Sequence, residues 1–170
     1  TSTNVKCNGG TDGTITLKIQ GGNKNYTVTW KDNDNKPYTV TSTPITTTDN
    51  VIYNYIATGF KKGTYTYTIT DTNTPVATYI GTAITITAPP SSLIPTLSKT
   101  AQPSPSNIDG ILSLNVTGGY GNYSYVWKKD NVEMNPQPTV NPFGNVNGLA
   151  NGKYKVTVTD KGVNTGDGCP

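Results

Sequence analysis

One set of landmarks occurs twice along this 170-residue chain, at a constant spacing of 97 residues. The set comprises an Asp-Gly pair, a Gly-Gly pair, a tyrosine and a Trp-Lys pair. In the first copy these are Asp12-Gly13, Gly21-Gly22, Tyr26 and Trp30-Lys31, and in the second they are Asp109-Gly110, Gly118-Gly119, Tyr123 and Trp127-Lys128. Such self-similarity indicates a duplicated structural unit, so the chain is expected to fold as two modules of one kind.

A later block of landmarks also repeats and places the boundary between the modules. Residues 63–71 and residues 152–160 both open with Gly-x-Tyr and close with Thr-x-Thr-Asp, at a spacing of 89 residues. The two spacings, 97 against 89, make the second copy eight residues shorter before this block, as one fold with a variable loop would be. The prolines Pro89 and Pro90 favour an extended linker. We therefore assign the first module to residues 1–88 and the second to residues 89–170.

Residue usage indicates an all-β fold. Thr occurs 31 times, mostly at alternate positions among Val, Ile and Tyr, and these residue types favour a pleated, half-buried surface. In residues 14–19 the apolar side chains Ile15, Leu17 and Ile19 share one face of an expected strand. By the same reading, strands are expected at 14–19, 26–31, 38–43, 51–57, 64–70 and 82–87 in the first copy, and at 93–99, 111–116, 123–128 and 153–159 in the second.

The strand pattern of each copy matches an immunoglobulin-like β-sandwich, with about seven short strands and a single tryptophan. Trp30 and Trp127 are predicted to be buried core anchors; the alternative is a surface platform for a ligand. Tyr65 and Tyr154, which open the late strand, resemble the corner tyrosine of such sandwiches. The predicted fold is therefore two tandem immunoglobulin-like β-sandwich modules.

The residue types that are missing exclude several functions. The chain has no His and no Arg, and so lacks a ready general base near neutral pH, an imidazole metal ligand and a bidentate clamp for phosphate. Its 13 Lys give a net charge of +3 but never form a run longer than two, which argues against nucleic-acid binding. No stretch is apolar enough to span a membrane. We expect no catalytic residue, no cofactor and no membrane insertion.

Repeated acidic residues are the candidate metal ligands. Asp12 with Asp71, and Asp109 with Asp160, could meet at one end of each module and hold calcium. The alternative is that they support turns and cap backbone amides. The loop at residues 32–37 begins like a calcium loop but has Pro37 where a glycine is needed and Thr43 where a glutamate is needed, so we expect a plain polar hairpin loop.

At residues 4–13, Asn-Val-Lys-Cys-Asn-Gly-Gly-Thr-Asp-Gly, the chain resembles the opening of SprB-type repeats. The Gly-Gly, Tyr and Trp landmarks and the late Gly-x-Tyr strand extend this resemblance over both copies. These repeats occur in very large surface adhesins of Bacteroidetes, including a gliding-motility adhesin. The resemblance implies an extracellular, cell-surface repeat segment that acts in attachment or gliding motility and is not an enzyme. Its implied partners are neighbouring repeats of the same or adjacent chains, with surface polysaccharide as a further candidate.

The cysteines depart from the pattern that the resemblance implies, which is one Cys at the start of a repeat and a Gly-Cys after its late strand. The first copy keeps only Cys7, and the second keeps only Cys169, with Ser104 at the position of Cys7. No disulfide within a module is available to either copy. With no His to activate a thiol, we expect two free structural thiols that do not pair with each other.

Two other functions remain open. One is a carbohydrate-binding module in which exposed tyrosines, such as Tyr53, Tyr55 or Tyr120, stack on sugars. The other is an accessory domain of a secreted hydrolase. The positions of the repeats relative to the ends of the chain add one expectation. The first copy is expected to have a shortened first strand, and the second copy is expected to lack its last strand. An unpaired sheet edge in the second copy would then accept a strand from a neighbouring molecule.

Overall fold

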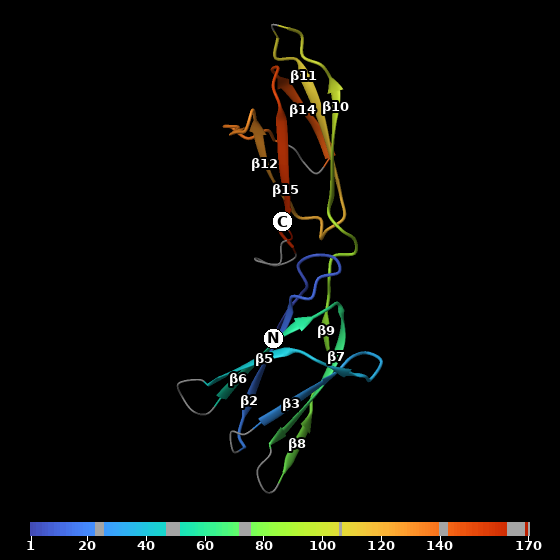
Figure 1. Ribbon diagram of the computed structural model, residues 1–170, viewed down its shortest axis with the longest axis vertical. Helices are drawn as coiled ribbons and strands as arrows, with labels where there is room; N and C mark the ends of the chain where they lie inside the picture. The colour runs from blue at the N-terminus through green and yellow to red at the C-terminus, as the bar shows by residue number, and fades with distance from the viewer. Residues whose placement is uncertain are drawn as a thin grey trace. The chain divides into compact units, whose positions relative to one another are not determined.

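The computed structural model describes residues 1–22, 26–46, 52–71, 76–105, 107–139, 143–162 and 169. The chain divides into two compact units, Thr1–Ala88 and Pro89–Pro170, here called unit 1 and unit 2. All paired strands are antiparallel (Figure 1), which confirms the all-β class. The described residues contain no helix, and hence none with the length and apolarity of a membrane span.

Two sheets form unit 1, and the first has the strand order β1-β2-β6-β5. Its strands are β1 (Ser2–Thr3), β2 (Gly13–Gln20), β6 (Ile52–Phe60) and β5 (Thr41–Thr46). The predicted alternation of β2 is observed, because Ile15, Leu17 and Ile19 are buried while Lys18 and Gln20 are exposed. This period of two puts one face of the sheet on the core.

The second sheet of unit 1 has the order β4-β3-β7-β8. Its strands are β4 (Pro37–Tyr38), β3 (Tyr26–Lys31), β7 (Gly63–Asp71) and β8 (Ala77–Ile80). A further strand, β9 (Ile84–Ile86), pairs with residues 63–65 of β7. Strand β7 is therefore paired on both edges, by β3 on one side and by β8 and β9 on the other.

The core of unit 1 lies between these two sheets. Ile15 and Ala57 from the first sheet are buried in it, together with Trp30 and Tyr65 from the second. Trp30 is 3% exposed and packs edge-on against Phe60, with ring centroids 5.0 Å apart. Burying each large apolar side chain contributes roughly 1.5–3 kcal/mol, so this aromatic cluster is an important part of the core.

Unit 2 has two three-stranded sheets, with the orders β10-β11-β14 and β13-β12-β15. Their strands are β10 (Ile94–Ala101), β11 (Gly110–Thr117), β14 (Phe143–Leu149), β13 (Val132–Glu133), β12 (Tyr123–Lys129) and β15 (Tyr154–Asp160). Its core contains Leu114 and Val116 of β11, Trp127 of β12 and Val158 of β15. Trp127 is 0% exposed, so both tryptophans are core residues, as predicted.

Three strands of each unit correspond in sequence: β2 with β11, β3 with β12, and β7 with β15. Two differences stand out. Unit 2 begins with the eight-residue strand β10, whereas its counterpart in unit 1, β1, has two residues. In the described part of unit 2, no strand takes the places of β8 and β9; the edge of β15 carries only an isolated bridge from Asp160 to Cys169.

The sequence analysis gave wrong bounds for some strands and did not predict others. The single strand expected at 38–43 is split into β4 and β5, and the strand expected at 82–87 is confined to β9. Strand β8 was not expected, since all four of its residues are exposed and give no inward face. Strand β14 was not expected either, because Gly144, Asn145 and Asn147 are poor strand formers.

Candidate functional site

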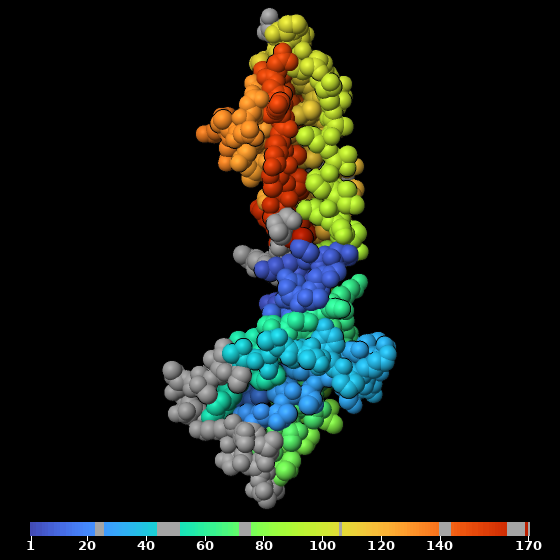
Figure 2. Space-filling model, in the orientation of Figure 1, coloured from blue at the N-terminus to red at the C-terminus, as the bar shows by residue number. Residues whose placement is uncertain are grey.

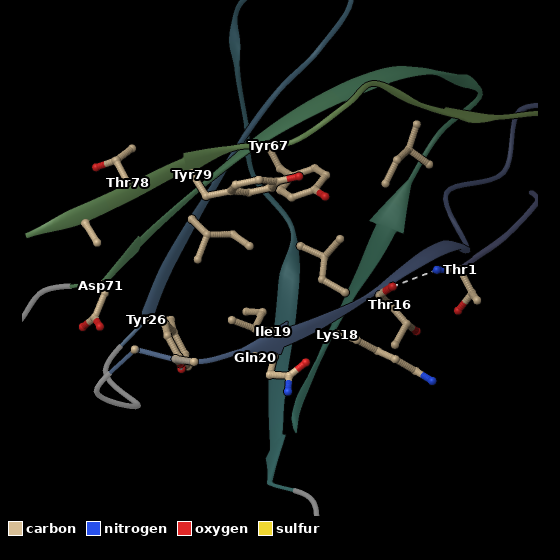
Figure 3. Close-up of a pocket in the computed structure, with 16 residues that line it drawn as sticks. Thr1, Thr16, Lys18, Ile19, Gln20, Tyr26, Tyr67, Asp71, Thr78 and Tyr79 are labelled. Carbon is tan, nitrogen blue, oxygen red and sulfur yellow. Dashed lines mark hydrogen bonds between the residues drawn. The ribbon is translucent and has the colours of Figure 1, made fainter. Parts of the chain in front are cut away.

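A groove of about 610 Å³ opens in unit 1 between the two sheets. Figure 3 shows the β2 residues Thr16 to Gln20 on one side of it and Tyr67 and Tyr79 on the other. Apolar side chains such as Leu17, Ile19 and Ile69 line it, and Asp71 and Thr78 are among its polar lining residues. Burial, and then the neighbouring Tyr79, raises the pKa of Tyr67. The groove is thus a mostly apolar slot with polar groups around it.

The groove lies where pairing on the outer edge of β2 stops. Strand β1 pairs only with Ile15 and Thr14. Next to them, the ammonium of Thr1 donates to the Thr16 carbonyl at 2.9 Å, and the Thr16 N–H donates to the Thr1 carbonyl at 2.8 Å. Beyond Thr16 no strand in the described part of the chain pairs with this edge.

The repeated Gly-Gly and Tyr landmarks form one hydrogen-bonded corner in each unit. The Tyr26 hydroxyl donates to the Gly21 carbonyl, and the Tyr123 hydroxyl donates to the Gly118 carbonyl. Both glycines of each pair have positive φ angles, between 67° and 85°, a region that other residues adopt only with strain. The spacing from Gly-Gly to Tyr is therefore set by this corner.

The Asp that ends each late strand sits over the second glycine of the corner. A side chain at Gly22 would collide with the Asp71 carboxylate, and one at Gly119 with the Asp160 carboxylate. Asp160 is fully buried and accepts hydrogen bonds from the N–H groups of Tyr120, at 2.6 Å, and Gly162, at 3.3 Å. This carboxylate is used to cap backbone amides.

The tyrosines of the Gly-x-Tyr motifs also hold turns. The Tyr65 hydroxyl donates to the Lys61 carbonyl at 3.1 Å, and the Tyr154 hydroxyl donates to the Ala150 carbonyl at 2.8 Å. Burial is the main cause that raises the pKa of both tyrosines, followed by the hydrogen bond to Tyr38 for Tyr65 and by the charge of Asp130 for Tyr154. Each hydroxyl thus binds a backbone carbonyl four residues earlier in the chain.

The calcium candidates do not come together. Asp12 precedes β2 and accepts from the Lys6 N–H at 3.2 Å, whereas Asp71 lies beside Gly22, past the other end of that eight-residue strand. Strand β11 separates Asp109 from Asp160 in the same way. The described residues contain no group of three or more Asp, Glu, Cys or His suited to a metal.

Asp109 supports a turn instead. Its carboxylate accepts the N–H and the hydroxyl of Ser104, both at 2.8 Å. The Ser104 N–H, followed by the Ser104 hydroxyl, lowers the pKa of Asp109. These contacts match the alternative reading of the repeated acids, in which they cap backbone groups.

The polar loop that follows β3 is a tight turn. The Asp32 carboxylate accepts the N–H groups of Asp34, at 3.0 Å, and Lys36, at 2.9 Å. Asn35 adopts a φ of 66°, a conformation that Asn tolerates better than most residues. The carboxylate is engaged by its own loop, as expected of a hairpin turn.

The tyrosines expected to be exposed are not. Tyr53 and Tyr55 are half-buried and pack against the core of unit 1, where Tyr53 lies edge-on to Tyr26 at 5.7 Å. Tyr120 is half-buried as well. The exposed tyrosine in the described residues is Tyr79, at 59%, beside the groove. The sequence reading missed the groove, whose lining residues come from strands far apart in the sequence.

The expectation of two free, unpaired thiols is wrong. Cys7 and Cys169 are both disulfide-bonded, and no free cysteine exists. The expectation rested on the loss of one cysteine from each copy, and pairing within a copy is not the only way for a cysteine to bond. An oxidising compartment is where such bonds persist.

Comparisons with known proteins relate the first strands to one family. No curated protein matches the chain. The sequence model of the SprB repeat matches residues 1–35, a segment that carries β1, β2 and β3 with the Asp-Gly, Gly-Gly, Tyr and Trp landmarks. SprB repeats occur in cell-surface proteins, which suggests a surface location for this chain. Over residues 1–35 the resemblance to an SprB-type repeat is confirmed.

Proposed function

We propose that the chain is a structural and adhesive repeat segment of a large cell-surface protein, which acts in surface attachment or gliding motility. The single observation that carries the proposal is the use of the repeated residues. Glycine, tyrosine and aspartate landmarks hold turns, and the tryptophans fill cores, in both units. Duplication has thus preserved a scaffold. The SprB match over residues 1–35 supports the same reading.

The proposed architecture is a tandem of immunoglobulin-like sandwiches. The buried Trp30 and Trp127 and the corner tyrosines Tyr65 and Tyr154 support it. The second unit is the shorter variant, without counterparts of β8 and β9 among its described residues. We propose neighbouring repeats, of the same or adjacent chains, as the main partners.

A non-catalytic role is part of the proposal. The chain has no His to act as a general base. Asp160, the buried acid of the described residues, is engaged by two backbone N–H groups. Both cysteines are disulfide-bonded, so neither offers the thiolate that a nucleophile requires.

Immunolabelling tests the proposed location. Antibodies raised against the chain are expected to label intact, unpermeabilised cells that produce its parent protein, and antibody fragments are expected to reduce attachment of these cells to a surface. An unrelated antibody of the same class is the control. Labelling that appears only after cell lysis would contradict the proposal.

The carbohydrate-binding alternative has weaker support. Sugar-stacking sites need exposed aromatic faces, and Tyr53, Tyr55 and Tyr120 are half-buried. Tyr79 is the remaining exposed candidate. Glycan-array binding by the chain that is lost in the Tyr79→Ala variant would favour this alternative and also surface polysaccharide as a partner.

A further inference from the structure

The outward face of the sheet β13-β12-β15 in unit 2 carries lysines from two neighbouring strands. Lys128 of β12 and Lys155 of β15 are direct partners in the antiparallel register, so their side chains lie on the same face of the sheet. Trp127, the residue before Lys128, is buried. Because side chains alternate between the two faces of a strand, both lysines point away from the core, and both are exposed. Figure 2 shows β15, in red-orange, at the surface of unit 2.

Like charges directly opposite each other destabilise an antiparallel pair, and the described acids nearby are engaged by other groups. Asp130 accepts the N–H of Lys153 at 2.8 Å. Glu133, which faces Lys128 from β13, accepts from the side-chain amide of Gln137 at 3.4 Å. Neither Lys128 nor Lys155 forms an ion pair with a described residue. The two ammonium groups are therefore a positive pair that the described part of the chain does not compensate.

Unit 1 has no such pair at the corresponding place. Through the spacings of 97 and 89 residues, Lys31 corresponds to Lys128 and Thr66 corresponds to Lys155. Lys31 and Thr66 are direct partners in the register of β3 and β7. The two units share their buried and turn-forming landmarks and differ at this exposed position, so core packing does not explain the second lysine.

The rest of the same face bears hydroxyl groups. The rows next to the lysine pair are Val126↔Thr157 and Ser124↔Thr159. Hydroxyls both donate and accept hydrogen bonds, as the hydroxyls of sugars do. Val126 is 39% exposed and offers a small apolar contact between the two rows. The face thus combines two cations with hydroxyls on adjacent strands.

Other polyanions and peptides fit this face less well than an acidic polysaccharide. Nucleic acids are bound largely through Arg side chains and exposed aromatic rings, but the chain has no Arg, and Tyr123 and Tyr125 of β12 pack against the core. Anionic membranes attract clusters of about four to eight basic residues, which is more than this face has. Peptides add to a sheet edge or fill a groove, and this surface is the face of a sheet.

We propose that the outward face of β12 and β15, centred on Lys128 and Lys155, is a binding surface for a carboxylate-bearing polysaccharide. A carboxylate between the two ammonium groups removes their repulsion, while sugar hydroxyls bind the hydroxyls of Thr157 and its neighbours. Recognition uses charge in place of the aromatic stacking that a tyrosine site would need. The proposal rests on the surface role proposed above and names a partner for it. One such face binds weakly, and several copies would bind more tightly through multivalency.

Oligogalacturonate, a short polymer of carboxylate-bearing sugars, is the probe for this surface. Titrated into the full-length chain at low salt, it is expected to shift the amide NMR signals of Lys128, Lys155 and Thr157 saturably. Added salt should weaken the binding, because exposed charges are screened. An uncharged oligomer of galactose is the ligand control and should leave these signals in place.

Lys155→Thr introduces the residue that unit 1 has at this position. It is expected to weaken binding about two- to fivefold, the range of one exposed charge contact. The same change should raise the thermal unfolding midpoint of unit 2, because the repulsion with Lys128 is removed. These opposite signs separate lost recognition from damaged folding. Lys99→Thr, an equal change of charge on the other sheet of unit 2, is the matched control and should leave affinity nearly unchanged.

The converse substitution in unit 1 tests whether the lysine pair is sufficient. Thr66→Lys places a lysine opposite Lys31. In this variant oligogalacturonate is expected to shift the amide signals of Lys31 and Thr68, which should stay in place in the parent chain. Unshifted signals in the variant would show that a cross-strand lysine pair is not what recognises the polymer.

Several other outcomes would overturn the proposal. They are absence of saturable shifts in unit 2, equal weakening by Lys155→Thr and Lys99→Thr, and a Lys155→Thr variant that loses stability together with binding. A DNA strand or vesicles of anionic lipid that bind this face more tightly than oligogalacturonate would assign it to that polyanion instead. None of these outcomes changes whether antibodies label intact cells, so this proposal and the proposed function can fail separately.

Discussion

At the scale of single residues, the repeated landmarks form connected hydrogen bonds at the Gly-Gly turns. The positive φ angles of Gly21 and Gly118 let the chain turn, and the hydroxyls of Tyr26 and Tyr123 bind the carbonyls of those turns. The buried Asp160 then binds the amide of Tyr120, one residue beyond the corner. These hydrogen bonds share the same turn, so a substitution that removes one of them is expected to weaken the others.

Truncation of the two core tryptophans tests their role as core anchors. Trp30→Ala and Trp127→Ala should each lower the free energy of unfolding by about 3–5 kcal/mol, because both side chains are at most 3% exposed. Chemical denaturation measures the change. A Lys36→Ala variant, at an exposed position, is the control and should change little. A cost below about 1 kcal/mol for either tryptophan would contradict its role as a core anchor.

The two repeated acids of unit 2 make a matched pair for a second test. Asp160→Ala removes a fully buried carboxylate and leaves the Tyr120 N–H without this partner, which should cost about 1–3 kcal/mol. Asp109→Ala removes an exposed carboxylate and should cost less. Equal costs, measured by denaturation at neutral pH, would show that burial of Asp160 is not what stabilises the corner.

Alkaline pH is expected to destabilise both units through Tyr65 and Tyr154. Burial raises the pKa of Tyr65 and Tyr154 above the ordinary value of 10.0. A raised pKa means that the folded state holds the proton more tightly, so this contribution is complete below about pH 10 and is lost as pH rises through the folded pKa. Thermal unfolding at rising pH, compared with Tyr65→Phe and Tyr154→Phe variants, measures it. Variants that lose stability as steeply as the parent would contradict the assignment.

At the scale of strands, the sequence predicted those elements whose two faces differ. Strand β2 alternates Ile15, Leu17 and Ile19 with polar residues, and one face is buried as expected. Strand β6 carries Tyr53 and Tyr55 on one face and Ile52, Asn54 and Ile56 on the other. Because large apolar residues occupy both faces, alternation could not show which tyrosines are buried.

The groove could not be predicted from residue patterns, because its lining is assembled from strands that lie far apart in the sequence. Residues of β2 line one side, and residues of β7 and β8 line the other. The disulfide state of Cys7 and Cys169 escaped prediction for a related reason. Whether two cysteines bond depends on distances in space that their spacing in sequence does not give.

Hydrogen exchange tests the difference between β7 and β15. The Asp160 N–H points away from β12, toward Cys169, so by alternation the Val158 N–H points the same way. Its counterpart Ile69 faces Tyr79 of β8. The Val158 amide should exchange at least about tenfold faster than the Ile69 amide, while the Thr157 amide, which faces β12, is the slow control. Equal rates at Val158 and Ile69 would mean that a strand covers the β15 edge.

At the scale of the whole chain, each unit has a core of its own. All members of the first cluster lie within residues 1–88, and all members of the second lie within residues 89–170. Separate cores are what allow tandem modules to fold as independent units. We therefore expect the stability of each repeat to be set mainly by its own core.

Separate expression of the two units tests this independence. Fragments of residues 1–88 with Cys7→Ser, and of residues 89–170 with Cys169→Ser, are each expected to give dispersed NMR spectra and cooperative unfolding. Unit 2 should be the less stable, because the smaller Leu149 takes the place of Phe60 and no described residue of its core takes the place of Ile86. In the described residues, moreover, the outer edge of β15 carries only an isolated bridge, whereas β7 is paired there with β8 and β9. The full chain with both substitutions is the control, and its two transitions should match those of the fragments. A fragment that is unfolded alone but folded in this control would show that the repeats stabilise each other and that the array is cooperative.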